Sequence, residues 1–222
     1  MTSSLPDVFE YPVRGSPRFD ALVVGGGLHL LAVWLPLIPF VAVAGYLSRV
    51  LAATATVEPG DTAERPSWRP IGPLLRDGLR LIVTAVGYLV VPVTLLLVTL
   101  GGPLEGIDPT GTTDGVLFLV GTTVSTLLAF AICYPLPAAL VAVAREGSLR
   151  AAVDTTLVGT ATRDAGYLVA TLLAVAGLGL TAAAYGALNA VALGFFIGFY
   201  VEVVAAAAVG QATGRAWERR GI

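Results

Sequence analysis

Lysine is absent from this chain of 222 residues, and cysteine and histidine occur only once each. The single cysteine, Cys133, excludes an intrachain disulfide and any metal site built from several cysteines. The single histidine, His29, leaves too few ligands for a usual metal centre of three or four side chains. We therefore expect no metal and no other cofactor.

Charge is also scarce, because charged residues make up only 13% of the chain, against about 25% in soluble proteins. This composition argues against a soluble globular enzyme and against a disordered chain. All 13 basic residues are arginines, and 15 acids give a net charge of −2. Such a balance does not suit a nucleic-acid partner, and a lysine-free, acid-leaning chain is typical of a halophile.

What the chain has instead is apolar sequence, with 56% hydrophobic residues and a mean hydropathy of +0.83. In lipid every backbone amide needs an internal partner, and the apolar stretches lack strand-like alternation, so helices are expected. The sequence predicts an all-α, polytopic transmembrane helical bundle with short interfacial helices. One domain (21–217) lies between a polar N-terminal segment (1–20) and a C-terminal tail (218–222). The expected membrane segments cover about residues 21–47, 79–100, 115–144, 165–185 and 187–210.

The first apolar segment is interrupted by Pro36 and Pro39 and allows two arrangements. A hairpin would have arms of about 14 residues, or about 21 Å each, which is short of the bilayer core of about 30 Å. We therefore favour a single kinked crossing over a re-entrant hairpin. A cleaved signal peptide ending at Ala42-Val43-Ala44 is disfavoured, because the apolar run is too long and contains prolines.

The last apolar block, residues 165–210, is too long for one span of about 20 residues. Glycine and asparagine favour a tight turn between Tyr185-Gly186 and Asn189. A second break is expected at Tyr134-Pro135, because proline interrupts the helical hydrogen bonding.

Arginine distribution predicts the orientation of the chain. The loop at 101–114 has no arginine and carries three acids, Glu105, Asp108 and Asp114, whereas arginines occupy the linker 48–77, the connection 145–164 and the tail. The arginine-bearing regions should share the cytoplasmic side of the cell membrane, and the C-terminus should lie there too.

Glu202 is the one charged residue between Asp164 and Arg215. It lies about 13 residues before Arg215, or roughly 20 Å along a helix. A charged side chain at such depth is costly and is often functional. Glu202 is therefore a candidate proton or ion site, with a structurally hydrogen-bonded acid as the alternative.

Glu202 also belongs to a row of small residues with a spacing of four, which includes the GxxxG pair Gly194 and Gly198. Small residues at this spacing let two helices approach closely, either within one chain or between two subunits. The predicted helix-packing ridge consists of Gly186, Ala190, Gly194, Gly198, Ala206, Gly210 and Gly214.

His29 follows three consecutive glycines, Gly25-Gly26-Gly27. The glycines lack the preceding strand and the following lysine of a phosphate loop, so helix packing is their expected role. His29 is either a packing residue or a partner of Glu202 in a proton relay.

Arginines and tryptophans lie together at two edges of the apolar segments. Such residues can bind anionic lipid headgroups or simply anchor a helix at the interface. The candidates are Trp68, Arg69, Arg76, Arg80, Arg215 and Trp217.

Several short motifs recur in a fixed order: GYLSRV at 45–50, GPLLRDGL at 72–79, YPLPAAL at 134–140 and REGSLRAA at 145–152. Over about residues 10–217 they resemble an uncharacterised integral-membrane family of halophilic archaea, the domain of unknown function 4013. The resemblance implies a polytopic helical protein and carries no assigned activity.

Hydrolase and metalloprotease motifs are missing, so we do not expect an enzyme. The leading hypothesis is a membrane scaffold or accessory protein that packs with lipid, with a second copy of itself or with another membrane protein. The alternative is a small transporter or channel that uses Glu202. A polar cavity that holds Glu202 with His29, Tyr88 or Tyr134 would favour transport, and a sealed interface would favour the scaffold.

Overall fold

The computed structural model describes residues 5–13, 20–35, 37–57, 63–101, 112–189 and 192–222, which are helical over most of their length and contain no strand. Five helices are long and apolar enough to cross a membrane: Leu37–Ala55, Ile71–Thr99, Phe118–Glu146, Ala165–Ala184 and Leu193–Glu218. The predicted all-α multi-pass membrane fold is thereby confirmed. The elements are α1 (Leu5–Glu10), η1 (Tyr11–Val13), α2 (Asp20–Ala32), α3 (Leu37–Ala55), α4 (Ile71–Gly101), α5 (Thr112–Cys133), α6 (Leu136–Glu146), η3 (Leu149–Val153), α7 (Thr155–Thr162), α8 (Ala165–Asn189) and α9 (Leu193–Glu218).

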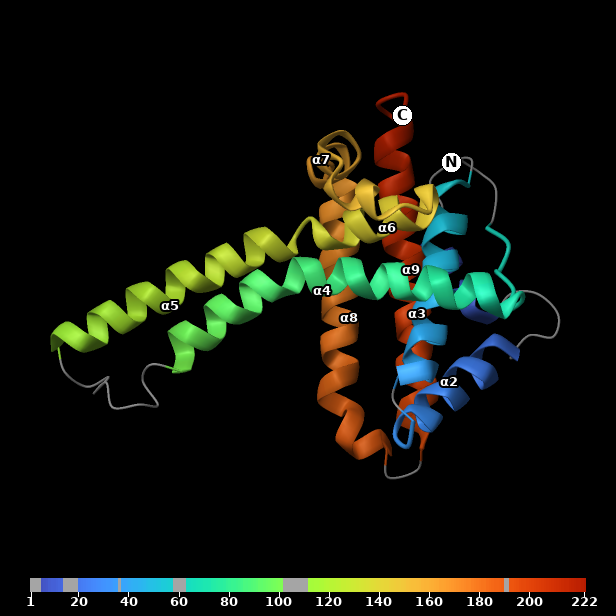
Figure 1. Cartoon of the computed structure of the whole chain (residues 1–222), viewed down its shortest axis with the longest axis horizontal. Coiled ribbons are helices and arrows are strands. Elements are labelled where there is room, and N and C mark those ends of the chain that lie inside the picture. Colours follow the sequence, from blue (N-terminus) through green and yellow to red (C-terminus); the bar gives the residue numbers. More distant parts are fainter. Residues whose placement is uncertain (1–4, 14–19, 36, 58–62, 102–111, 190–191) are drawn as a thin grey trace.

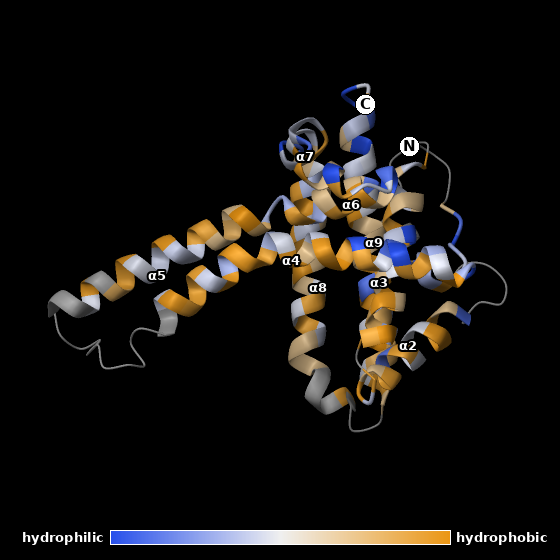
Figure 2. Ribbon diagram, in the orientation of Figure 1, coloured by the Kyte–Doolittle hydropathy of each residue, from blue (hydrophilic) through white to orange (hydrophobic). Residues whose placement is uncertain are grey.

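The helices form a body and an arm (Figure 1). In the body, α9 packs against α2, α3 and α8. Helix α4 crosses α3, and its C-terminal half pairs with α5 to form the arm, which projects away from the body (Figure 1). The arm is apolar along its described length (Figure 2), and most of its large side chains are exposed. Its surface therefore requires lipid or another chain to cover it.

The first apolar segment is two helices and not one kinked helix. Helix α2 ends at Ala32, a turn follows, and α3 begins at Leu37 and packs back against α2. Pro39 fits in the first turn of α3, where a helix needs no backbone N–H donor; Pro36 lies outside the described residues. The chain thus folds as a hairpin at the proline break, in place of the single kinked crossing favoured from the sequence. Its second arm, α3, is long enough to span a membrane, unlike the short arms of the predicted re-entrant hairpin, and α2 is shorter than the helices that could span.

Glycines allow two helices, α3 and α4, to approach at backbone distance. A β-carbon on Gly45 of α3 would overlap the Leu74 carbonyl of α4, and one on Gly78 of α4 would overlap the Val41 carbonyl of α3. Since neither carbonyl can move without its helix, the crossing of α3 and α4 requires both glycines. Small residues serve this purpose at helix contacts in membranes.

The expected break at Tyr134-Pro135 is present, and a distant tyrosine bridges it. In an unbroken helix the Ala138 N–H would donate to the Tyr134 carbonyl. Instead, the Tyr167 hydroxyl accepts from the Ala138 N–H at 3.1 Å and donates to the Tyr134 carbonyl at 2.7 Å. A side chain inserted into the helical hydrogen-bond ladder is a known cause of a sharp bend, and this one separates α5 from α6.

The turn in the last apolar block falls a few residues later than expected. Helix α8 continues to Asn189, and α9 begins at Leu193 after Ala192, which has a left-handed φ of 59°. Glycine and asparagine, which are turn formers, predict the turn at 185–189. In the structure these residues extend α8, because an apolar environment favours continued internal hydrogen bonding of the backbone.

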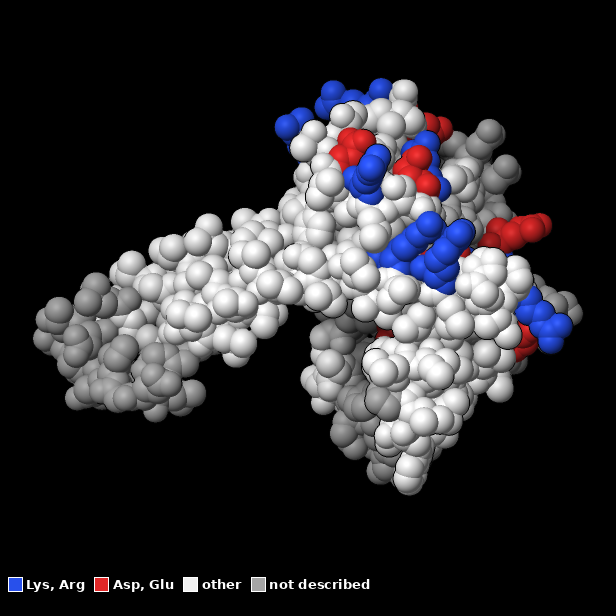
Figure 3. Space-filling model, in the orientation of Figure 1, with Lys and Arg blue, Asp and Glu red and all other residues white. Residues whose placement is uncertain are grey.

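Charged side chains collect on one end of the body, around α6, α7 and the C-terminus, and on the adjoining part of α4 (Figure 3). The opposite end of the body and the described part of the arm are almost free of charge on the visible face (Figure 3). Loop residues Glu105 and Asp108 lie outside the described residues. The separation matches the arginine-rich belt that the sequence predicts.

Candidate functional site

The structure brings Glu202 and His29 together, although they are far apart in the sequence. Glu202 lies within α9, roughly 20 Å along the helix from Arg215, and His29 lies near the end of α2. His29 Nε2 is 3.2 Å from Glu202 Oε1. This pair is the relay partnership that the sequence analysis considered beside the packing role of His29.

The glycines before His29 bring α2 close enough for this contact. A β-carbon on Gly25 would overlap the ring of Phe199, and one on Gly26 would overlap the ring of Phe196, whereas Gly27 has open space. Two aromatic rings of α9 therefore lie against the glycine backbone of α2. The glycines act in helix packing, and the His29 ring is placed 5.8 Å from the Phe199 ring between centroids.

The second hydrogen bond of His29 fixes how protons are arranged in the pair. His29 Nδ1 is 3.0 Å from the Gly25 carbonyl oxygen. Since a carbonyl oxygen can only accept, Nδ1 carries a hydrogen. Nε2 and Glu202 then share one proton, either as neutral imidazole with carboxylic acid or as imidazolium with carboxylate. Both forms have zero net charge, so the pair adds no net charge to the membrane interior.

The pair is partly shielded, with side-chain exposures of 14% for His29 and 30% for Glu202. Glu202 Oε2 is buried and has no hydrogen-bond partner among the described residues. An acceptor of this kind can receive a further donor, such as a bound proton carrier or water. In the described part of the chain, no third His, Cys, Asp or Glu joins the pair to make a metal site.

The two tyrosines considered as companions of Glu202 lie elsewhere. The Tyr88 hydroxyl donates to the Ala152 carbonyl at 2.6 Å, and the Tyr134 hydroxyl donates to the Thr162 carbonyl at 3.0 Å. Both bonds tie helices to the short segments at the charged end of the body. The structure therefore brings together only His29 and Glu202 of the four residues named for a transport cavity.

The predicted ridge is divided between helices. Gly186 belongs to α8, and Ala190 lies outside the described residues, so the ridge on α9 begins at Gly194. Gly198 has open space where a β-carbon would be. A close approach is made further along the helix.

Gly210 and Gly214 of α9 lie against the end of α3. A β-carbon on Gly210 would overlap the Thr54 side chain, and one on Gly214 would overlap the Ala55 carbonyl. Ala206 continues this face and packs against the buried core. Two members of the predicted ridge, Gly210 and Gly214, thus make a close contact within the chain, whereas Gly198 does not.

Of the two predicted tryptophan anchors, Trp217 is buried and Trp68 is half-buried. Trp217 is 1% exposed, its indole N–H donates to the Leu157 carbonyl at 2.8 Å, and Arg145 lies 5.0 Å above its ring. Trp68 stacks on Tyr46 with ring centroids 4.3 Å apart. The Trp217 ring therefore packs within the body, whereas Trp68 packs against Tyr46 and keeps part of its surface exposed.

The predicted arginine anchors stay near the surface. Arg69 and Arg76 are exposed, and Arg80 is half-buried beside Asp77, with 3.5 Å between Nη1 and Oδ1. Arg215 is half-buried and donates to the Gln211 side chain at 3.3 Å. These side chains remain candidates for contact with headgroups.

Sequence reasoning missed two structural residues, Tyr167 and Arg49. Arg49 donates to the carbonyls of Ser67, Arg69 and Pro70 at 2.5, 3.0 and 3.0 Å and so fixes the segment that enters α4. The only available signal for Tyr167 was the pair of prolines at 135 and 137, which lack N–H groups and leave nearby backbone atoms in need of partners. The identity of that partner depends on tertiary contacts.

Comparison with known proteins gives a family and nothing more specific. A family model described as a protein of unknown function, DUF4013, matches residues 29–191. No curated protein and no solved structure matches the chain. The match includes His29 and most of the helices of the fold, but ends before Glu202.

Proposed function

Because the chain belongs to the DUF4013 family, for which no activity is described, we propose a function from the geometry: a non-enzymatic membrane scaffold or accessory protein that packs with lipid or partner proteins. The observation that carries this proposal is the arm. Only 17% of the membrane-length window of α4 is buried within the chain. An apolar surface of this extent requires a covering of lipid or protein.

The exposed side chains of the arm lie on both of its helices. Leu97 and Val98 of α4 are 68% and 72% exposed, and Leu127 and Phe130 of α5 are 64% and 68% exposed. Between the helices, the hydroxyls of Thr99 and Ser125 lie 2.9 Å apart. This hydroxyl pair lies between the helices, and the exposed Thr123 hydroxyl donates to the Leu119 carbonyl of its own helix, which leaves an outer surface suited to apolar partners.

Photocrosslinking tests this proposal. A photoreactive residue at Leu127 reports on the arm, and one at Val175, which is exposed on α8, is the matched control. We expect protein adducts, with a second copy or another membrane protein, at Leu127 in native membranes. Lipid adducts alone at both positions would remove protein partners from the proposal.

A transporter or channel is the second candidate function, and the Glu202–His29 pair favours it. The pair holds one shared proton, and Glu202 Oε2 has no partner among the described residues. The three pockets described at the charged end of the body are lined by other residues. A scaffold needs no path between the pair and water.

Proteoliposomes distinguish the two functions. We expect no protein-dependent proton or cation flux, and the same result for Glu202→Gln. Flux that Glu202→Gln abolishes, while a fold control such as the mobility of the purified protein is unchanged, would overturn the scaffold in favour of transport.

We further propose that the arginine-rich end of the body faces the cytoplasm, with the C-terminus on that side of the cell membrane. Arginine-rich segments are retained on the cytoplasmic side during insertion, and the charges collect on one end of the body (Figure 3). In a Cys133→Ala background, a cysteine replacing Arg220 should react with a membrane-impermeant maleimide only after the cells are opened. Labelling in intact cells would reverse the orientation.

A further inference from the structure

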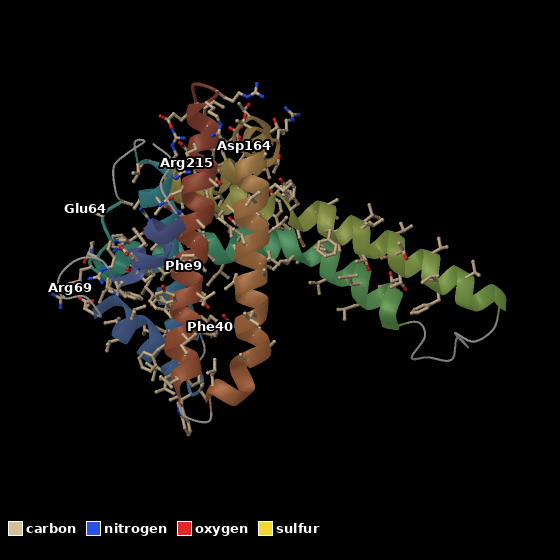
Figure 4. The ribbon with its side chains drawn as sticks, turned by 180° about the vertical axis from the view of Figure 1, so that it is seen from behind. Phe9, Phe40, Glu64, Arg69, Asp164 and Arg215 are labelled. Atoms are coloured by element: carbon tan, nitrogen blue, oxygen red, sulfur yellow. The ribbon has the colours of Figure 1, made fainter. Side chains whose placement is uncertain are left out.

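A groove between α8 and α9 combines an apolar wall with arginines at one end. It has a volume of about 430 Å³ and its wall includes Val169, Ala170 and Leu173 of α8 and Ala208 of α9. Arg215 and Arg219 line the same groove. Figure 4 shows α8 and α9 side by side, with Asp164 and Arg215 near their upper ends.

Helical spacing explains why these side chains share the groove. On α8 they are separated by one, three or four positions, and on α9 Ala208, Gln211, Ala212, Arg215 and Arg219 follow the same spacing, which puts them on one helix face. The small side chains among them leave space between the two helices. The N-terminal helix contributes Val8, which is buried and closes one side of the groove.

The apolar wall of the groove is open on its outer side. Val169 and Leu173 are each 55% exposed, as expected for α8, of which only 17% of the membrane-length window is buried. An acyl chain can therefore enter from the side without crossing polar protein. The apolar wall extends along the helices from the charged end toward the uncharged one, which is the direction that an acyl chain takes from its headgroup.

The cations at the charged end differ in how far they are neutralised. Arg219 Nη2 lies 2.6 Å from Asp164 Oδ2, whereas Arg215 donates to the neutral Gln211 side chain. Arg219 also lines a second pocket, of about 310 Å³, together with Arg163 and Arg220. The charged end thus has more arginines than acids. Arg215 is the principal charge available to a ligand in the groove.

We propose that this groove binds an anionic glycerophospholipid, with the phosphate at Arg215 and Arg219 and one acyl chain along Val169, Leu173 and Ala208. Charge complementarity selects the anionic headgroup, since guanidinium groups bind phosphate oxygens well. The apolar wall selects a lipid over a free phosphate. The inference rests on the proposed membrane role and names one lipid that the scaffold holds.

Native mass spectrometry of the purified protein in mixed micelles tests the site, with phosphatidylglycerol and phosphatidylcholine supplied in equal amounts. We expect selective retention of phosphatidylglycerol. Arg215→Gln should lower the retained ratio about fivefold, because one arginine near anionic lipid contributes about 1 kcal/mol. Arg150→Gln is the matched control, since Arg150 is an exposed arginine of η3 at the same end of the body.

Further variants and a competition experiment identify the class of ligand. Ala170→Phe should fill the groove and lower the retention of phosphatidylglycerol without removing any charge, and Arg215→Lys should restore part of the selectivity that Arg215→Gln loses. Free glycerol phosphate should not displace the lipid; if it does, the site binds phosphate alone and the lipid assignment is overturned.

Equal losses from Arg215→Gln and Arg150→Gln would assign the selectivity to the general basic surface and overturn the site. The unfolding midpoint of each variant shows whether the protein is still folded. If the lipid-binding proposal fails, the photocrosslinking result at the arm is unaffected. The two proposals can therefore fail separately.

Discussion

Replacing Tyr167 with phenylalanine tests how the protein tolerates a broken helix inside an apolar environment. The hydroxyl of Tyr167 is the donor to Tyr134 and the acceptor for Ala138, and the side chain is fully buried. Phenylalanine keeps the ring, whose contact with Tyr134 is edge-on at 5.4 Å between centroids. The substitution thus removes two hydrogen bonds and little else.

The expected loss follows from those two bonds. Hydrogen bonds between membrane helices average about 0.6 kcal/mol and reach about 1.7 kcal/mol, so two bonds give about 1–3 kcal/mol. A buried N–H or carbonyl that stays unsatisfied raises the loss, and direct pairing of the Ala138 N–H with the Tyr134 carbonyl would reduce it. We expect Tyr167→Phe to lower the free energy of unfolding by about 2 kcal/mol.

The assay is unfolding in mixed micelles by increasing sodium dodecyl sulfate, followed by circular dichroism. Tyr88→Phe is the matched control, because it removes a single bond, to Ala152, from a half-buried tyrosine. We expect it to cost about 0.6 kcal/mol. If Tyr167→Phe costs no more than Tyr88→Phe, the hydroxyl does not bridge the helix break and the argument is refuted.

Three further predictions test other parts of the structure. Gly78→Ala should destabilise the α3–α4 crossing by about 2 kcal/mol or more, whereas Gly87→Ala, with open space at the β-carbon, should be neutral or stabilising by about 0.5–1 kcal/mol; equal effects on the detergent unfolding curve would contradict the contact. Burial raises the pKa of the Tyr11 hydroxyl, and the nearby Tyr46 raises it further, so the stabilisation is present below the unfolded pKa of about 10 and is lost as pH rises above it. The free energy of unfolding should therefore fall between pH 9 and 11 more steeply in the wild type than in Tyr11→Phe, and parallel curves would contradict this. Trp217→Phe should cost about 1–3 kcal/mol because it leaves the Leu157 carbonyl without its indole donor; an unchanged unfolding midpoint would show that the bond is dispensable.

The sequence predicted the class of fold and several elements within it. The polytopic helical fold, the five membrane-length helices and the break at Tyr134-Pro135 all follow from hydropathy, length and proline, which are properties of single segments. The gathering of charge at one end of the body follows from the positions of the arginines in the connections between the apolar segments. The position of Glu202, far along an apolar helix from the nearest charged residue, could also be found from the sequence, because it depends only on the distance along that helix to Arg215.

Tertiary structure decided which residues meet. That α2 folds back on α3, that His29 reaches Glu202, and that Gly210 and Gly214 are the ridge residues that lie against α3 all depend on how each helix is rotated and where it crosses its neighbour. Hydropathy is nearly equal around such helices, so it does not say which face packs inward. Which face of a helix packs inward is decided by close contacts with segments that are distant in the chain. These contacts form only when the helices pack.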